Sequence, residues 1–153
     1  YTEYMKRIFI AILFLGIFIL FPQQSFAQIN TTEKLITVDT GKQMLYAWEG
    51  GKIVYETPVA TGLPKSPTVK GTFKIYLKYE NQPVMRGVLP YIGKYAYKNV
   101  PHVMYFHQSY GLHGAYWHNS FGIRRSNGCV NLPLYAAKWL FDFAPIGTTV
   151  MVF

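Results

Sequence analysis

The chain has 153 residues, a formal net charge of +8, a single cysteine, 18% aromatic residues and only 14% charged residues. These numbers fit one small globular domain and exclude a disordered chain, a collagen-like chain and a disulfide-stabilised scaffold. The basic excess suits polyanionic neighbours such as cell-wall polymers or anionic lipid headgroups, or it serves solubility alone. No run of Lys and Arg is dense enough to favour nucleic acid.

The first 27 residues predict a secretory signal peptide. Two basic residues at 6–7 precede an uninterrupted apolar run at 8–21, and a small-x-small cleavage pattern follows at 25–27. A helix formed by this run extends about 21 Å, which is shorter than the ~30 Å hydrocarbon core of a bilayer. Translation is expected to begin at Met5. An uncleaved membrane anchor is the alternative.

Removal of the signal peptide leaves a mature domain, residues 28–153, with 13 Lys or Arg against 6 Asp or Glu. A chain of that length has room for one hydrophobic core. No internal repeat, low-complexity tract or second domain is found in it. The signal peptide is then the only part of the chain that we expect to contact a membrane.

Alternation of apolar with polar residues dominates the mature domain. At its start, β-branched and aromatic residues occupy three short runs separated by Gly-containing turns, which predicts an antiparallel meander. The same alternation returns further along, and the final residues are expected to close the domain as a strand. The expected strands cover 33–38, 43–48, 53–59, 71–79, 102–107 and 148–153.

Two segments differ from this pattern. The stretch from Glu80 to about Pro101 contains several prolines and glycines, which predicts a long irregular loop of the kind that forms lids or binding loops. Only Leu134 to Phe143 looks helical, and Pro133 suits its first turn. The expected fold is mainly β, a sandwich or open barrel with one helix near the C-terminus.

The chemistry of the sequence is concentrated around Ser126-Asn127-Gly128-Cys129. A sole cysteine in an exported protein has no intramolecular disulfide partner, so its thiol is either buried and inert or has a chemical function. Gly128 allows a tight turn whose backbone N–H groups can bind an oxyanion beside the sulfur. A helix that begins a few residues downstream also favours the thiolate.

A thiol nucleophile needs a base to remove its proton at neutral pH, and histidine is the usual one. The candidates are His102, His107, His113 and His118. Their spacing along the chain does not select among them.

The pair His113-Gly114, followed by Ser126-Asn127-Gly128-Cys129, resembles the signature of the YkuD-type L,D-transpeptidase catalytic domain, in which a His-Gly precedes Ser/Thr-x-Gly-Cys. Cys129 lies 16 residues beyond His113, a spacing that the family uses. The segments at 59–62, 66–75 and 116–122 are also similar to family segments. The resemblance covers roughly Leu35 to Phe153, with Asn127 standing where many members carry histidine.

This resemblance implies a role for each matched residue. Cys129 is the nucleophile, His113 is the base, and a backbone carbonyl near Gly114 orients the imidazole in place of a triad carboxylate. The N–H groups of Gly128 and Cys129 stabilise the oxyanion, each such donor being worth about 3–4 kcal/mol. Contacts to the turn or the substrate are assigned to Ser126, Asn127, Asn131, Trp117, Arg124 and Arg125, with the arginines as partners of a carboxylate.

The implied reaction is acyl transfer on peptidoglycan stem peptides in the periplasm or cell envelope of a bacterium. The Cys129 thiolate attacks the carbonyl of the third stem residue and expels the terminal D-alanine, which leaves a thioester. An amine acceptor then gives a cross-link, whereas water makes the enzyme an L,D-carboxypeptidase. Carbapenems are the expected inhibitors, and no metal or organic cofactor is required.

Three alternatives accompany this interpretation. His118 is the main rival to His113 as base, ahead of His102 and His107. A zinc hydrolase could use His107, His113, His118 and Cys129, although no paired-ligand spacing such as Cys-x-x-Cys is present. A non-catalytic wall-binding module would leave Cys129 merely buried. If His113 and Cys129 form an ion pair, the midpoint of acylation should lie below the ~8.5 of a free cysteine.

Overall fold

The computed structural model describes residues 34–89 and 93–153, so the expected signal peptide at 1–27 lies outside the described residues. The first three described strands form the expected meander, with β1 (Leu35–Asp39), β2 (Met44–Glu49) and β3 (Lys52–Pro58) paired antiparallel. In β2, Leu45 and Ala47 are buried and the residue between them is only half-buried, as the alternation predicts. No helix among the described residues is long and apolar enough to cross a membrane.

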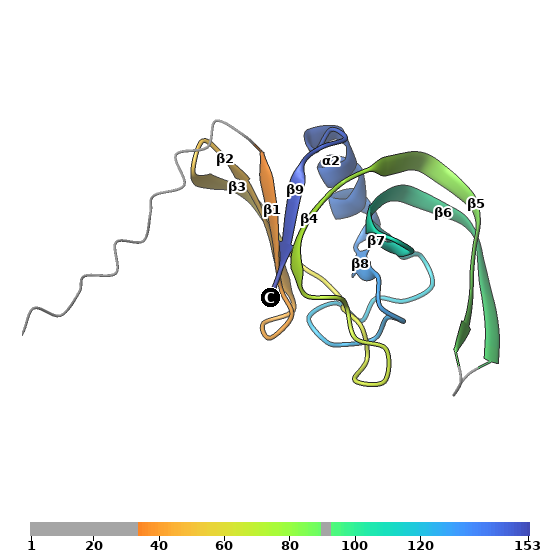
Figure 1. Ribbon diagram of the computed structural model, residues 1–153. Helices are drawn as coiled ribbons and strands as arrows, with labels where there is room; N and C mark the ends of the chain where they lie inside the picture. Colours follow the sequence, from red (N-terminus) through yellow and green to blue (C-terminus); the bar gives the residue numbers. More distant parts are fainter. Residues whose placement is uncertain (1–33, 90–92) are drawn as a thin grey trace, which may run out of the picture.

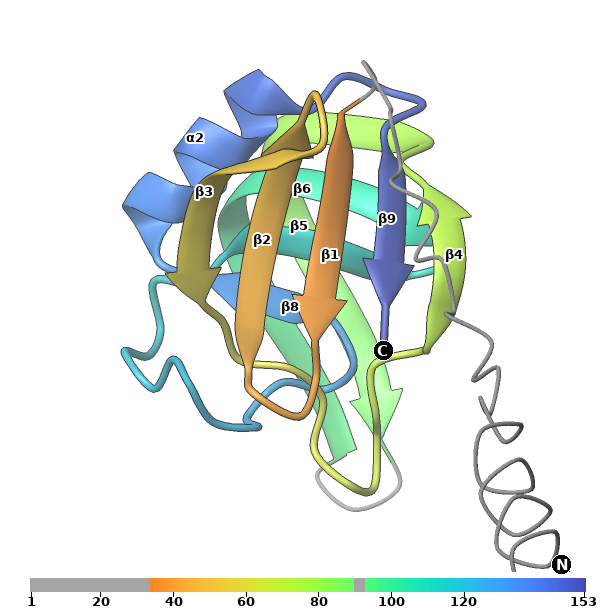
Figure 2. The same ribbon diagram turned by 90° about the vertical axis from the view of Figure 1, so that its left-hand side faces the viewer.

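The meander belongs to a five-stranded sheet with the order β3-β2-β1-β9-β4. Strand β9 (Thr149–Val152) follows the helix in the chain and inserts between β1, to which it is parallel, and β4 (Gly71–Lys74), to which it is antiparallel. Figure 2 shows this sheet face on, with the second sheet behind it. The hydrophobic core lies between the two sheets and the helix.

The second sheet has four strands in the order β5-β6-β7-β8. These are β5 (Leu77–Leu89), β6 (Gly93–His107), β7 (Tyr110–Gly114) and β8 (Val130–Leu132). Strands β7 and β8 are parallel, and their register places His113 opposite Asn131. This pairing therefore brings the His-Gly segment beside the residues that follow Cys129.

The single strand expected at 71–79 is instead two strands in different sheets. The chain changes sheet at Ile75, whose N–H donates to Thr148 (2.9 Å), while the N–H of Tyr76 donates to Tyr105 in the other sheet (2.9 Å). The Ile75 side chain is almost fully buried at this crossing. A continuous alternating pattern cannot reveal such a crossing, because both halves keep the same period.

The prediction of an irregular loop between Glu80 and Pro101 is also wrong, because most of this stretch forms a long β5–β6 hairpin. The hairpin projects beyond the body of the molecule in Figure 1. Pro83 is tolerated because β5 is the edge strand of its sheet, where a missing N–H breaks no ladder. The expectation that this stretch borders a binding site is taken up below.

Helix α2 spans Leu134–Phe143, the bounds expected from the sequence, and begins after Pro133. Its buried face is formed by Ala136, Ala137 and Leu140, and the helix packs against β6 and β7. Two lysines from outside the helix donate hydrogen bonds to carbonyl groups at its C-terminal end. Lys34 donates to the Phe143 carbonyl (2.8 Å), and Lys78 donates to the Phe141 (2.5 Å) and Ala144 (2.6 Å) carbonyls. These cations satisfy carbonyls that the helix leaves unpaired.

Candidate active site

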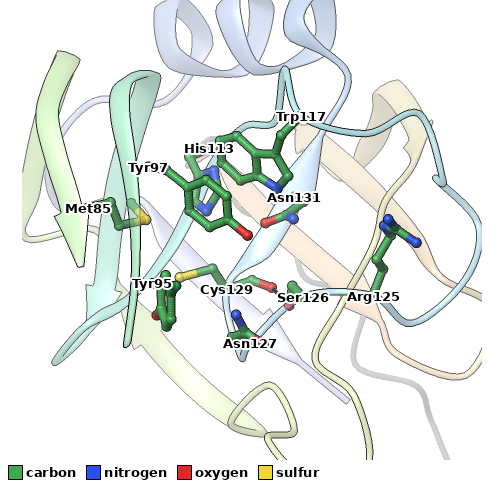
Figure 3. A pocket seen from close by; sticks show the side chains of 10 residues that line it. All are labelled: Met85, Tyr95, Tyr97, His113, Trp117, Arg125, Ser126, Asn127, Cys129 and Asn131. Atoms are coloured by element: carbon green, nitrogen blue, oxygen red, sulfur yellow. Dashed lines mark hydrogen bonds between the residues drawn. The ribbon is translucent and has the colours of Figure 1, made fainter. Parts of the chain in front are cut away.

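The two halves of the sequence motif meet at one small cavity. His113 comes from β7, and Ser126 to Cys129 form the turn that leads directly into β8. Figure 3 shows the imidazole and the sulfur on the same side of this cavity. The lining residues are Met85, Tyr95, Tyr97, His113, Trp117, Arg125, Ser126, Asn127, Cys129 and Asn131.

The Ser126 hydroxyl holds the turn that presents Cys129. It donates to the Cys129 carbonyl and accepts the N–H of Gly128 at 3.1 Å. In the resting turn the Gly128 N–H is thus already engaged, although the sequence assigns it to the oxyanion. Ser126 is nearly buried and lines the cavity, so its main contacts are within the turn.

Gly128 has a conformation that other residues adopt only with strain. Its φ is +118°, and a Cβ atom there would lie 2.9 Å from the ring of Tyr110. We expect Gly128→Ala to destabilise the fold by about 1–3 kcal/mol and to slow reactions of the thiol, because the turn must shift. Denaturant unfolding and thiol kinetics check this.

Gly122→Ala is the matched control, because Gly122 also has a positive φ (+90°) but a Cβ there would meet nothing within 4 Å. It should lose stability only through backbone strain and leave the thiol kinetics unchanged. Equal effects of the two substitutions on the thiol would show that contact with Tyr110 does not shape the turn.

His113 has the geometry of a neutral base with a fixed tautomer. Its side chain is 2% exposed, and Nδ1 lies 3.0 Å from the Gly114 carbonyl oxygen. The carbonyl can only accept, so Nδ1 carries the proton and Nε2 is left as the acceptor. Burial lowers the pKa of His113 to about 4, against an opposing effect of the Gly114 hydrogen bond. The imidazole is therefore uncharged at neutral pH.

Gly114 has its own packing requirement. A Cβ atom there would lie 3.0 Å from Pro101 and 3.1 Å from Leu134, so a side chain would press on α2 and β6. The residue that supplies the orienting carbonyl is thus also the one that lets the helix approach β7 closely.

Cys129 is partly exposed, and its thiol donates to the Ser109 carbonyl at 3.5 Å. Burial of the sulfur among the cavity walls raises the pKa of this thiol to about 11, with a backbone hydrogen bond at Gly111 acting in the opposite direction. Burial disfavours the charged form of both Cys129 and His113. Both groups are therefore uncharged at neutral pH, and the thiol is hydrogen-bonded to the Ser109 carbonyl.

His118 is placed differently from His113. The Ser120 N–H donates to its Nδ1 (3.1 Å), and the amide nitrogen of Asn131 lies 3.0 Å from its Nε2. Both ring nitrogens are thus engaged, and His118 does not line the cavity of Cys129. Asn131 links the two histidines, since it lies opposite His113 and its side chain binds His118.

The other two histidines, His102 and His107, both lie on β6. His107 packs against Phe73 and Tyr110, and His102 packs against Phe141. Neither lines the cavity. Within residues 34–89 and 93–153, no group of three or more His, Cys, Asp or Glu is arranged to hold a metal ion. The donor set for the zinc alternative is therefore not assembled there.

The two adjacent arginines, Arg124 and Arg125, have different surroundings. Arg125 lines the cavity, on the side away from the sulfur in Figure 3, whereas the Arg124 guanidinium donates to the Thr40 carbonyl (3.0 Å). Arg124 thus holds its loop to the β1–β2 turn and does not line the cavity. Asn127 lines the cavity beside Cys129.

The β5–β6 hairpin supplies cavity residues that the sequence did not single out. Met85, Tyr95 and Tyr97 form the wall opposite the motif, and Tyr97 stacks on Trp117 with 3.9 Å between ring centroids and 8° between planes. The only sequence signal was the alternation of Tyr95 and Tyr97 within the supposed loop. The expected role of this stretch at a binding site matches its position at the cavity.

A second, wider cavity adjoins the first and shares Met85, Tyr95, Asn127 and Cys129 with it. Its other walls include Ser109, Tyr110 and Tyr105. Burial raises the pKa of Tyr105 to about 12, and the nearby Cys129 adds to the shift. Cys129 therefore lines both cavities, whose walls combine aromatic side chains with an arginine, Arg125 in the first and Arg86 in the second.

A family model of the YkuD L,D-transpeptidase catalytic domain matches residues 33–152. The chain belongs to this family. The two sheets and the C-terminal helix of the described residues are the fold expected for a YkuD domain. A search of curated proteins finds no match.

Solved L,D-transpeptidases share this YkuD fold. One from Mycobacterium smegmatis is 27% identical, with a TM-score of 0.73 over 79% of this chain and 58% of its own. The catalytic domain of an Enterococcus faecium L,D-transpeptidase is 29% identical, with a TM-score of 0.71 over 80% and 98%. An L,D-transpeptidase in complex with imipenem is 25% identical, with a TM-score of 0.72 over 78% and 58%. The chain thus spans under two thirds of the first and third relatives.

Proposed function

We propose that this domain is a cysteine-dependent L,D-transpeptidase that acts on peptidoglycan stem peptides. The observation that carries the proposal is that one cavity is lined both by the Cys129 thiol and by a buried imidazole whose Nε2 is held as an acceptor. That arrangement suits general-base activation of a thiol during attack on a carbonyl. The imipenem complex of a family member supports the same chemistry.

In the first half-reaction, Nε2 of His113 takes the thiol proton as the sulfur of Cys129 attacks the carbonyl carbon of the third stem residue. The N–H of Cys129 is the principal donor to the resulting oxyanion, because the Gly128 N–H is engaged by Ser126. When the tetrahedral intermediate collapses, His113 returns its proton to the departing amine. D-Alanine leaves, and the stem remains bound as a thioester.

In the second half-reaction, an uncharged amine of another stem attacks the thioester carbonyl and gives its proton to His113. The carbon–sulfur bond breaks, the thiolate recovers the proton, and a direct cross-link is released. Attack by water in place of the amine releases a free tripeptide instead. The second cavity beside Cys129 offers room for either acceptor.

Intact mass spectrometry of the purified protein after incubation with imipenem tests the proposal. We expect the mass of the protein to rise by one acyl adduct, and Cys129→Ala to remain unmodified. A thiol that stays free would support the wall-binding alternative instead. Incubation with a stem tetrapeptide, alone and with an amine acceptor, separates hydrolysis from cross-linking, since only cross-linking gives a product larger than the donor.

We also infer that the domain works in the cell envelope, after removal of residues 1–27. The family model and the basic, apolar and small-residue order of that segment support this placement.

Arg125 is the residue proposed to pair with a substrate carboxylate. We expect Arg125→Gln to raise the KM for a stem tetrapeptide by about 10-fold, because a charge-assisted hydrogen bond is lost. Arg124→Gln is the matched control, since its guanidinium is bound to Thr40 outside the cavity. Steady-state rates of D-alanine release give the KM of each variant. An equal rise in KM for the two variants would contradict the assignment of Arg125.

A further inference from the structure

Gln43 is a buried polar residue in the turn between β1 and β2. It is 4% exposed and has a φ of +57°. Its Nε2 donates to the Thr40 carbonyl (2.6 Å) and to the Thr61 hydroxyl (2.7 Å), while its Oε1 accepts the Thr61 N–H (2.9 Å). Each polar atom of the amide group is therefore partnered, and two of the three bonds hold Thr61.

Thr61 connects Gln43 to the turn formed by Ser126 to Cys129. It is fully buried, and its carbonyl accepts the N–H groups of both Arg125 (2.9 Å) and Ser126 (3.0 Å). The Ser126 carbonyl in turn accepts the N–H of Leu63 (3.0 Å). The first residue of the turn is thus fixed on both sides by the segment that Gln43 holds.

Resting on the proposed function, we propose that Gln43 is a positioning residue for acyl transfer, acting through Thr61 and Ser126 on the turn that presents the Cys129 N–H and thiol. The path is continuous, because the Ser126 hydroxyl binds both the Gly128 N–H and the Cys129 carbonyl. Gln43 itself does not line the cavity.

A hydrogen-bonding side chain is needed at position 43 because the Thr61 N–H is buried. If an apolar group replaces the amide, this N–H loses its acceptor, and the Thr61 hydroxyl loses its donor. Unpaired buried groups cost free energy and move to find new partners. A shift of Thr61 would move the Ser126 N–H with it, and hence the donor that faces the oxyanion.

Two reagents separate this role from a general effect on stability. Imipenem acylates the thiol through a tetrahedral oxyanion, whereas iodoacetamide alkylates it by direct displacement and forms no oxyanion. For Gln43→Met, which keeps the length of the side chain, we expect the acylation rate constant to fall by about 10- to 100-fold, as for a small misplacement of a catalytic group. The alkylation rate should remain close to that of the unmodified protein.

Val38→Ala is the matched control, because Val38 is fully buried in β1 of the same sheet and has no polar side-chain atom. It destabilises the fold through a cavity, so its melting temperature falls without a change at Thr61. Both rates should stay unchanged in this variant. If acylation and alkylation fall together in Gln43→Met, or if Val38→Ala slows acylation equally, the role is refuted.

Gln43→Glu covers the case in which the methionine variant does not fold. An uncharged carboxyl group can still accept the Thr61 N–H and donate once, whereas the carboxylate can only accept. Acylation of this variant should therefore decline as the pH rises through the titration of Glu at this position, a limb absent from the unmodified protein. An identical pH profile would overturn the proposal. An unmodified protein that reacts with iodoacetamide but not with imipenem would instead refute the proposed function, and this role with it.

Discussion

Acylation of the His113→Gln variant by imipenem at pH 7 is expected to be about 10³- to 10⁴-fold slower than acylation of the unmodified protein. Glutamine keeps a hydrogen-bonding group in the buried site but cannot take the thiol proton. Because the pKa of the thiol is raised to about 11, very little thiolate forms without a base. Stopped-flow kinetics with a large excess of imipenem measures the rate constant directly.

His118→Gln is the control for this prediction. The side chain of His118 binds Ser120 and Asn131 and does not line the cavity, so its loss should disturb Asn131 but leave proton transfer intact. We expect a far smaller decrease in rate than for His113→Gln. Loss of acylation in His118→Gln, with near-normal acylation in His113→Gln, would transfer the role of base to His118.

The second large effect is expected in the dependence of acylation on pH. Burial lowers the pKa of His113 to about 4, so the imidazole is an uncharged base throughout the neutral range. Acylation should therefore rise from acidic pH and reach its plateau below pH 7. The midpoint predicted here also lies below that of a free cysteine, but its physical cause is a neutral base and not the stabilised thiolate of an ion pair.

The His113→Gln variant should lose this acidic rise. Its rate then depends on thiolate that forms without assistance, and so it should climb steadily above pH 8 toward the raised pKa of the thiol. The two profiles should converge at alkaline pH, where the base no longer matters. Superimposable profiles would remove His113 from the mechanism, and a midpoint of the unmodified protein near 8.5 would indicate an ordinary, unassisted thiol.

The sequence predicts elements that depend on local order. The helix at Leu134–Phe143 follows from its spacing and from Pro133, and the meander follows from alternation and glycine turns. Gly128 could likewise be chosen for its conformational freedom before its φ was known. In each case, neighbours within a few residues decide the structure.

Features that depend on distant pairing could not be derived in this way. The change of sheet at Ile75 is decided by Thr148 and Tyr105, which lie far along the chain. The hairpin walls at Tyr95 and Tyr97 acquire their place only because β6 pairs with β7. Adjacent arginines look equivalent in sequence, yet the Thr40 carbonyl takes Arg124 away from the cavity and leaves Arg125 beside it.

The insertion of β9 between β1 and β4 governs the order in which the domain can assemble. The meander emerges early during synthesis, but its inner edge at β1 has no partner until the segment beyond α2 has been made. Closing that gap joins residues more than a hundred positions apart in the chain, as the pairing of Ile36 with Val150 shows. Such distant closure slows folding, because chain entropy is lost before the contacts form. Until then, the edge of β1 is open to pairing with other strands, which exposes the nascent domain to aggregation.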